Sequence, residues 1–177
     1  QTGRDGLTGL LDRGRLNTDG PRELKASVVA GRPMSLLLVD VDHFKSINDR
    51  HGHASGDACL REVALRLRDA FAAASVVARL GGEEFLVISP DTGLAAAMRL
   101  AERLRAAIAA SPAVLGAIHH SITVSIGVAE RDPVMVKFDE LLKAADQVLY
   151  HSKHLGGNQI HAANASAISP ASSPKAR

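Results

Sequence analysis

The chain of 177 residues has one cysteine, no tryptophan and only 3% aromatic residues. The single cysteine, Cys59, excludes an internal disulfide framework and a cysteine-based metal cluster, and it is consistent with a reducing compartment. No apolar run approaches the roughly 18 residues of a membrane-spanning helix, and residues 1–5 contain no apolar signal core. We therefore expect a cytoplasmic domain that makes no membrane contact.

A strong excess of charge of one sign is also missing. Lysine and arginine number 21 and aspartate and glutamate 19, so the formal net charge of +2 gives no support for a nucleic-acid partner. Apolar residues make up 46% of the chain, which is enough for the core of one ordinary domain. Because the sequence starts at Gln1, directly before dense motif sequence, we expect a fragment of a longer protein.

The apolar pattern predicts alternating helices and strands. Apolar residues at spacings of three and four predict helices over residues 22–30, 57–71, 94–108 and 138–149. Continuous or alternating apolar runs predict strands over residues 34–42, 76–80, 85–88 and 122–129. The second and third strands flank two glycines and predict a β-hairpin, so the fold class is α+β or α/β with a mixed or antiparallel sheet. We expect one domain over residues 1–163 and a loose tail rich in Ala, Ser and Pro over residues 164–177.

Carboxylates gather at the ends of the predicted strands. Asp40 and Asp42 close the first strand, and Glu83 and Glu84 follow the glycines of the hairpin. Alternation sends Asp40 and Asp42 to one face, and a neighbouring hairpin would bring Glu83 within a few ångströms of Asp40. Such a set of oxygen atoms favours Mg²⁺ and phosphoryl transfer, although acidic strand ends also occur on surfaces without a metal.

Polar residues that suit a purine nucleotide follow the first acidic strand. Lys45 can neutralise phosphate charge, while Asn48 and Asp57 offer an amide and a carboxylate. A carboxylate that accepts from a ring N–H and an exocyclic amine favours guanine over adenine, because adenine lacks that paired donor edge. The residues alone thus suit a purine edge, with guanine favoured over adenine.

Ordered motifs run through nearly the whole chain. They are D-G-L-T-G-L at residues 5–10, D-V-D-H-F-K-S-I-N-D at 40–49, G-H-A-S-G-D at 52–57, G-G-E-E-F at 81–85, S-I-G-V at 125–128, and a block from Ala145-Asp146 to Lys153. Together they resemble the GGDEF family of diguanylate cyclases, with the common Glu variant of the signature, from about residue 5 to residue 161. Their order makes the resemblance far more specific than any one motif.

The resemblance implies a fold, an activity and partners. The implied fold is α+β, with a palm-like, antiparallel-centred mixed sheet of about five strands flanked by helices. The implied activity converts two GTP molecules into cyclic di-GMP and two pyrophosphates, with Mg²⁺ as cofactor and Mn²⁺ as a possible replacement. Each domain would hold one GTP, so the reaction would need a two-fold homodimer, normally driven by an upstream sensor domain.

The resemblance also assigns roles to individual residues. Metal coordination falls to Asp40, the Val41 carbonyl and Glu83, and catalysis to Glu83, Glu84 and Lys45. Substrate binding falls to Phe44, Lys45, Asn48, His53, Asp57, Gly81, Gly82 and Lys153. The glycine pair would let the backbone approach the nucleotide. Which of Glu83 and Glu84 accepts the proton stays open.

Two departures from the family pattern leave a second interpretation in place. Ala72 and Ser75 stand where many members carry the Arg and Asp of a product-binding site, so we expect weak or absent feedback there. Arg66-Leu67-Arg68-Asp69 spells that pattern six residues too early, on a predicted helix. Gly157 replaces a usual phosphate-binding Arg, so GTP binding should be weaker and Gly157→Arg should strengthen it. The alternative is a catalytically silent GGDEF module that binds GTP or a partner protein; relaxed base choice is a third option, which Asp57 disfavours.

Overall fold

The computed structural model describes residues 2–134 and 137–164. Its strands are β1 (Met34–Val41), β2 (Val76–Gly81), β3 (Glu84–Pro90), β4 (Ala113–Leu115), β5 (Ile118–His120), β6 (Val124–Glu130) and β7 (Ile160–Asn164). Its helices are α1 (Arg13–Ala30), α2 (Phe44–His51), α3 (His53–Ala70), α4 (Leu94–Ala110) and α5 (Phe138–His154). None of these helices is both long enough and apolar enough to cross a bilayer.

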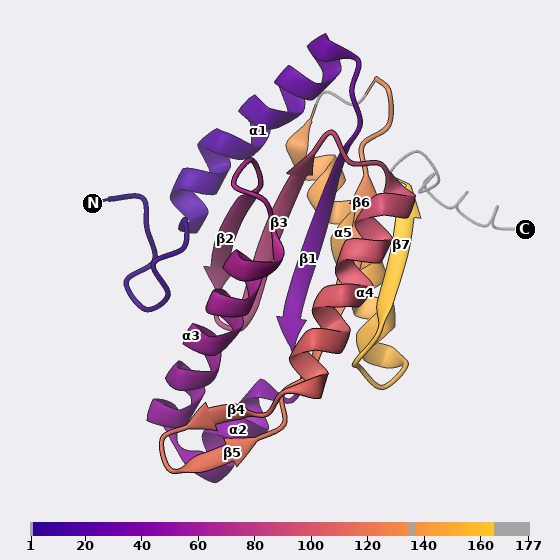
Figure 1. The fold of residues 1–177 in the computed structure, drawn as a ribbon. Helices are drawn as coiled ribbons and strands as arrows, with labels where there is room; N and C mark the ends of the chain where they lie inside the picture. The colour runs from indigo at the N-terminus through magenta and orange to yellow at the C-terminus, as the bar shows by residue number, and fades with distance from the viewer. Residues whose placement is uncertain (1, 135–136, 165–177) are drawn as a thin grey trace, which may run out of the picture.

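Five of the strands form one sheet in the order β2-β3-β1-β6-β7 (Figure 1). All neighbours are antiparallel except β6 and β7, which run parallel. Helices cover both faces, with α1 and α5 on one face and α3 and α4 on the other. This confirms the α+β class and the antiparallel-centred mixed sheet that the sequence predicts.

The central strand β1 carries the site residues because it is buried on both faces. Leu37 and Val39 lie in the core beneath α3 and α4, whereas Leu36 and Leu38 lie in the core beneath α1 and α5. The strand ends at Val41, one residue before the predicted end. Asp40, two residues after Leu38, therefore lies on the α5 face, at the point where the apolar strand gives way to polar groups.

Helix α1 begins nine residues earlier than predicted. The Asp12 side chain caps it by accepting a hydrogen bond from the Arg15 N–H, and Gly31 ends it in the left-handed conformation. Pro21 lies inside the helix, although proline usually marks a boundary. Next to this proline the helix packs on α5: a Cβ atom on Gly20 would lie 2.7 Å from the Phe138 ring.

Short elements account for the remaining differences from prediction. The β4–β5 ribbon and β7 carry no strong periodic signal, and β7 pairs with β6 at the sheet edge. The tail was predicted over residues 164–177. Asn164 is the last residue of β7, and residues 165–177 lie outside the described residues. The predicted hairpin of β2 and β3 is confirmed.

Candidate active site

The end of β1 lies beside the signature turn, from which we expected Glu83 to approach Asp40. In the antiparallel register Asp40 lies opposite Glu84 of β3 and opposite Ser125 of β6. The Val41 N–H donates to the Glu83 carbonyl oxygen over 3.2 Å, which places the signature turn beside the end of β1. Side chains directly opposite each other in such a pair have Cβ atoms about 5 Å apart, so Asp40 and Glu84 are close neighbours.

Lys153, near the end of α5, lies between two of these carboxylates. Its Nζ atom is 2.6 Å from Asp40 Oδ1 and 2.9 Å from Asp42 Oδ1. Burial lowers the pKa of Lys153, but the hydrogen bonds and charges of the two carboxylates outweigh this effect and raise it above its ordinary value. The lysine is therefore held in its charged form. We call Asp40, Asp42, Glu83, Glu84 and Lys153 the acidic edge.

The two aspartates of the acidic edge differ in their electrostatics. Burial, together with the negative charges of Glu83 and Asp42, raises the pKa of Asp40 despite the contact with Lys153. Burial also acts to raise the pKa of Asp42, but hydrogen bonds from Lys153, Ser125 and Thr123 lower it below its ordinary value. The anionic form of Asp40 is therefore destabilised, and an additional cation nearby would stabilise it.

Glu84 differs from an ordinary surface glutamate in its surroundings. It is partly buried, and burial followed by the negative charges of Asp40 and Asp146 raises its pKa, with Arg13 opposing. A cavity of about 340 Å³ opens beside it, lined by Arg13 of α1 and Asp146 of α5 among other residues. A carboxylate with a raised pKa next to open space is a candidate general base.

The donor set at the acidic edge is partial for a metal ion. Across residues 2–134 and 137–164, three or more His, Cys, Asp or Glu side chains are nowhere grouped so as to hold one. Mg²⁺ is commonly bound by one or two carboxylates together with waters and substrate phosphates, so Asp40, Glu83 and the Val41 carbonyl fit that chemistry. The Lys153 ammonium group between Asp40 and Asp42 shows that positive charge is accommodated at this place.

A second group of predicted residues lies where α2 meets α3. We use the name base pocket for the cluster formed by Phe44 and Asn48 of α2 and Gly56 and Asp57 of α3, after the base-binding role that the sequence predicts for Asn48 and Asp57. The Asn48 Oδ1 atom is buried and has no hydrogen-bond partner among the described residues. A Cβ atom on Gly56 would lie 1.8 Å from it, so only glycine leaves room for this amide. Buried acceptors without a partner are rare, so the position of this amide calls for an explanation.

The other predicted residues lie on exposed positions or in turns. Lys45, His53 and Asp57 are solvent-exposed, and Phe44 packs near Gly56. Gly81 and Gly82 have positive φ values of 140° and 51°, which explains the need for glycine at the turn. The space around their missing Cβ atoms is open, so the room for a close backbone approach that the sequence predicts is present.

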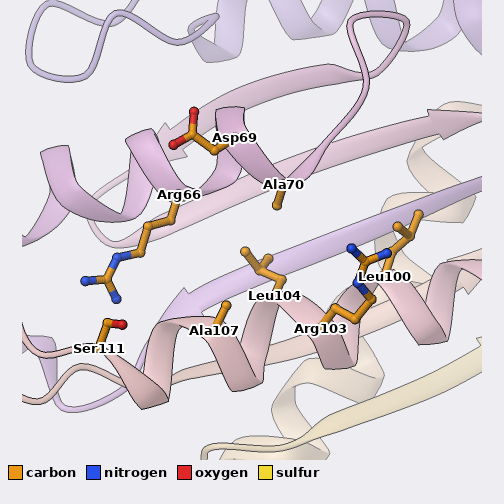
Figure 2. Close-up of a pocket in the computed structure, with 8 residues that line it drawn as sticks. All are labelled: Arg66, Asp69, Ala70, Leu100, Arg103, Leu104, Ala107 and Ser111. Atoms are coloured by element: carbon orange, nitrogen blue, oxygen red, sulfur yellow. The ribbon is translucent and has the colours of Figure 1, made fainter.

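The expected product-binding stretch, residues 72–75, follows α3, whereas the similar pattern at residues 66–69 lies on that helix. Arg66 and Asp69 lie on α3, as predicted, beside a cavity of about 420 Å³ between α3 and α4 (Figure 2). Arg66 reaches toward the end of α4, where it donates to the Ile108 carbonyl oxygen, and it also pairs with Glu62. The stretch from Ala72 to Ser75 carries only a backbone turn bond. Arg66 thus has a structural role between two helices.

Gly157 cannot simply be replaced by the usual arginine. Its φ is 76°, and a Cβ atom there would lie 2.9 Å from the carboxyl carbon of Asp42. A side chain at this position would be strained and would collide with a buried carboxylate. The structure therefore argues against the expected gain in GTP binding from Gly157→Arg.

Sequence reasoning missed the contacts that hold the acidic edge in place. Asp42 accepts hydrogen bonds from Thr123, Ser125 and the backbone of Asn158, and these partners are 81, 83 and 116 residues away. The two hydroxyls at alternating positions beside an apolar strand are the one signal that could have indicated this role. The sequence offers Arg79, like His154, as a cation that could substitute for the arginine missing at Gly157, but its contacts were missed: it donates to Asp5 and to the Gly82 carbonyl oxygen, linking the N-terminal loop to the signature turn.

Comparison with known proteins shows the family to which the chain belongs. The family model described as "Diguanylate cyclase, GGDEF domain" matches residues 2–159, and the chain belongs to this GGDEF domain family. It is 42% identical over 158 residues to the response regulator PleD of Caulobacter vibrioides and 40% identical over 159 residues to the diguanylate cyclase DgcP of Pseudomonas aeruginosa. These matches cover 88% and 90% of the chain but only 35% and 24% of those proteins, so the chain spans about a third or less of each.

Solved structures resemble this one closely. The GGDEF domain of DgcB from Caulobacter crescentus, in complex with c-di-GMP, has a TM-score of 0.87 and 32% identity, with 92% of this chain and 93% of that chain covered. The active GGEEF domain of a diguanylate cyclase from Vibrio cholerae has a TM-score of 0.80 and 29% identity, with 86% and 97% covered. The family thus contains diguanylate cyclases, which are nucleotidyltransferase-type enzymes.

Proposed function

We propose that this domain is a divalent-metal-dependent diguanylate cyclase that condenses two GTP molecules into cyclic di-GMP and two pyrophosphates. The observation that carries the proposal is the register that brings Glu83 and Glu84 against Asp40 and Val41, with Lys153 between the carboxylates. The name of DgcP and the bound c-di-GMP of the DgcB domain support the same activity.

The base pocket would select guanine. Asn48 Oδ1 has no partner among the described residues and would accept from an N–H donor of a guanine edge. Asp57, the residue after Gly56, would accept from the same edge. Adenine presents no such pair of donors, so it would leave the buried acceptor without a partner. Phe44 and His53 would border this pocket, and Lys45 would lie along the phosphates.

The acidic edge would carry the reaction. The ribose 3′-hydroxyl of one GTP attacks the α-phosphorus of the other, and pyrophosphate leaves. Bound Mg²⁺, or Mn²⁺ in its place, held by Asp40, Glu83 and the Val41 carbonyl, would supply charge neutralisation and a lower pKa for the attacking hydroxyl. Lys153 would neutralise phosphate charge, and Glu84, with its raised pKa, would be the better placed of the two glutamates to take the proton.

Because each domain would hold one GTP, the reaction would require two domains facing each other across a two-fold axis. The test is to incubate purified protein with GTP and Mg²⁺ at several protein concentrations and to separate the nucleotides by chromatography. The proposal predicts cyclic di-GMP, formed with more than first-order dependence on protein concentration, and no product when a chelator removes the metal.

The alternative is a silent module that binds GTP without converting it. Gly157 favours this alternative, because the arginine that the family usually offers to the phosphates is missing. Bound but unconverted GTP at high protein concentration, with Mg²⁺ and with Mn²⁺, would support the silent module and contradict the cyclase.

A further inference from the structure

Asp42 is the most densely bonded carboxylate near the site, and no role has been assigned to it so far. Its Oδ1 accepts from Ser125 Oγ (2.7 Å) and Lys153 Nζ (2.9 Å), and its Oδ2 accepts from Thr123 Oγ1 (2.7 Å) and the Asn158 N–H (2.8 Å). Its side chain is only 3% exposed. Donors from three separate segments thus converge on one buried group.

Asp42 has little capacity left to bind a metal ion. A carboxylate has about four lone-pair sites, and four donors already use them. Asp40 is different: Lys153 is the partner the structure gives its side chain, and the side chain is 14% exposed. Asp40 can therefore exchange its partner for a cation, whereas Asp42 would keep Lys153 in place while that exchange happens.

Asp42 also fixes the loop that follows α5. The loop turns through Gly157 and Asn158, which have positive φ values of 76° and 51°. The Asn158 N–H binds Asp42, and the Cα of Gly157 packs so closely that a Cβ atom would lie 2.9 Å from that carboxyl group. The conformation of this loop therefore depends on its contacts with the Asp42 carboxylate.

We propose that Asp42 is a positioning residue that holds Lys153 and the loop of residues 155–158 in the arrangement that receives a nucleoside triphosphate. This inference rests on the proposed function, because it gives Lys153 a phosphate partner. Asp42 itself does not touch substrate or metal; it acts through Lys153 and through the backbone of the loop.

The test compares Asp42→Asn with Asp19→Asn. Asparagine keeps the shape of Asp42 but can no longer accept four hydrogen bonds. Asp19 is a matched control, because it is a buried carboxylate that accepts from Arg15 and Arg22 on α1, away from the acidic edge. We expect Asp42→Asn to raise amide hydrogen exchange at residues 155–159 in the nucleotide-free protein and to weaken GTP binding in calorimetric titration by about tenfold or more. Asp19→Asn should leave both unchanged.

A double-mutant cycle shows whether Asp42 acts through Lys153. Lys153→Met removes the ammonium group, so adding Asp42→Asn to it should cost much less GTP affinity than Asp42→Asn costs alone. If Asp42→Asn does not fold, Thr123→Val with Ser125→Ala removes two of the four donors while keeping the charge, and the same two measurements apply. Normal loop exchange with normal GTP affinity in a folded variant, or additive effects in the cycle, would overturn the proposal. The amide hydrogen exchange measurement needs no GTP, so it can be interpreted even if the wild-type protein forms no cyclic di-GMP.

Discussion

The acidic edge and the base pocket differ in how their polar side chains are paired. At the acidic edge Lys153 pairs with both Asp40 and Asp42, so a bound cation or phosphate would have to displace existing contacts. In the base pocket Asn48 Oδ1 is buried and has no hydrogen-bond partner in the part of the chain that the structure describes, so a ligand that donates to it would add a contact. Under the proposed function, the first region would exchange partners and the second would gain one.

This difference separates the two tasks of the proposed enzyme. An internal ion pair lowers the cost of collecting several carboxylates in one place before the substrate arrives. An open acceptor instead penalises every ligand that cannot donate to it, which is a source of specificity. We therefore expect changes at the acidic edge to affect turnover most, and changes in the base pocket to affect the choice and affinity of the nucleotide.

The largest effect should come from Asp40→Asn. This change removes one of the two proposed carboxylate ligands of the metal. Because a bound metal ion stabilises the transition state of phosphoryl transfer by several kcal/mol, product formation should fall about a thousandfold or more. GTP affinity should fall much less. Chromatographic rates and calorimetric titration measure the two quantities, with the exposed Asp91→Asn as control. An equal loss of both would contradict the division of tasks.

Gly56→Ala should break the base pocket while leaving the acidic edge intact. The new Cβ would meet Asn48 Oδ1 at 1.8 Å and push the amide from its place. We expect a loss of about 1–3 kcal/mol in the free energy of unfolding from overpacking, and GTP affinity about tenfold lower with less discrimination against ATP. Gly6→Ala is the control, because nothing lies within 4 Å of its missing Cβ. Unchanged preference for GTP in a folded Gly56→Ala protein would refute the assignment of the pocket.

The elements that the sequence predicts well are those whose signal is local. The apolar run of β1, the two glycines before Glu83 and the helical spacing of α4 are each readable within a few residues. The predicted start of α1 at residue 22 was wrong, because the helix begins at Arg13 and runs through Pro21, a residue that locally signals a boundary. Edge strands as short as β5 carry too few residues for a period to show.

The candidate site follows the same rule. Strand alternation and a hairpin suffice to predict that the signature turn lies near Asp40, although the register places Glu84 and not Glu83 directly opposite that residue. The orphaned acceptor on Asn48 depends on how α2 packs on α3, and the four partners of Asp42 come from segments 81 to 116 residues away. No local pattern encodes such contacts, so residues that position others are harder to predict than residues that bear charge.

Gly157→Ala and Gly157→Arg test how closely the acidic edge is packed. Both residues would be strained at positive φ, and their Cβ would press on the Asp42 carboxyl group, so we expect a loss of about 1–2 kcal/mol in unfolding free energy and no gain in GTP affinity. Gly116→Ala is a matched control: its φ is 68°, but the space around it is open. The difference between Gly157→Ala and Gly116→Ala in chemical denaturation isolates the collision. Tighter GTP binding by Gly157→Arg would restore the expectation from sequence.

The smallest expected effect comes from the support behind the signature turn. Burial acts to raise the pKa of Asp5, but hydrogen bonds from Thr8 and Arg79 outweigh it and lower the pKa below its ordinary value of 3.8. Arg79 in turn binds the Gly82 carbonyl oxygen, so Asp5 stabilises the turn that carries Glu83. Asp5→Asn should cost about 1 kcal/mol of unfolding free energy at pH 7.

The pH dependence of that cost identifies its origin. A group with a lowered pKa in the folded state stabilises the fold above its unfolded pKa, and this contribution is lost as the pH falls through the folded pKa. The difference in melting temperature between the wild type and Asp5→Asn should therefore be constant from pH 7 down to about pH 5 and shrink below pH 4. A difference that stays constant down to pH 3 would show that Asp5 acts by shape and not by charge. In that case the turn beside Glu83 would be held without electrostatic help from the N-terminal loop.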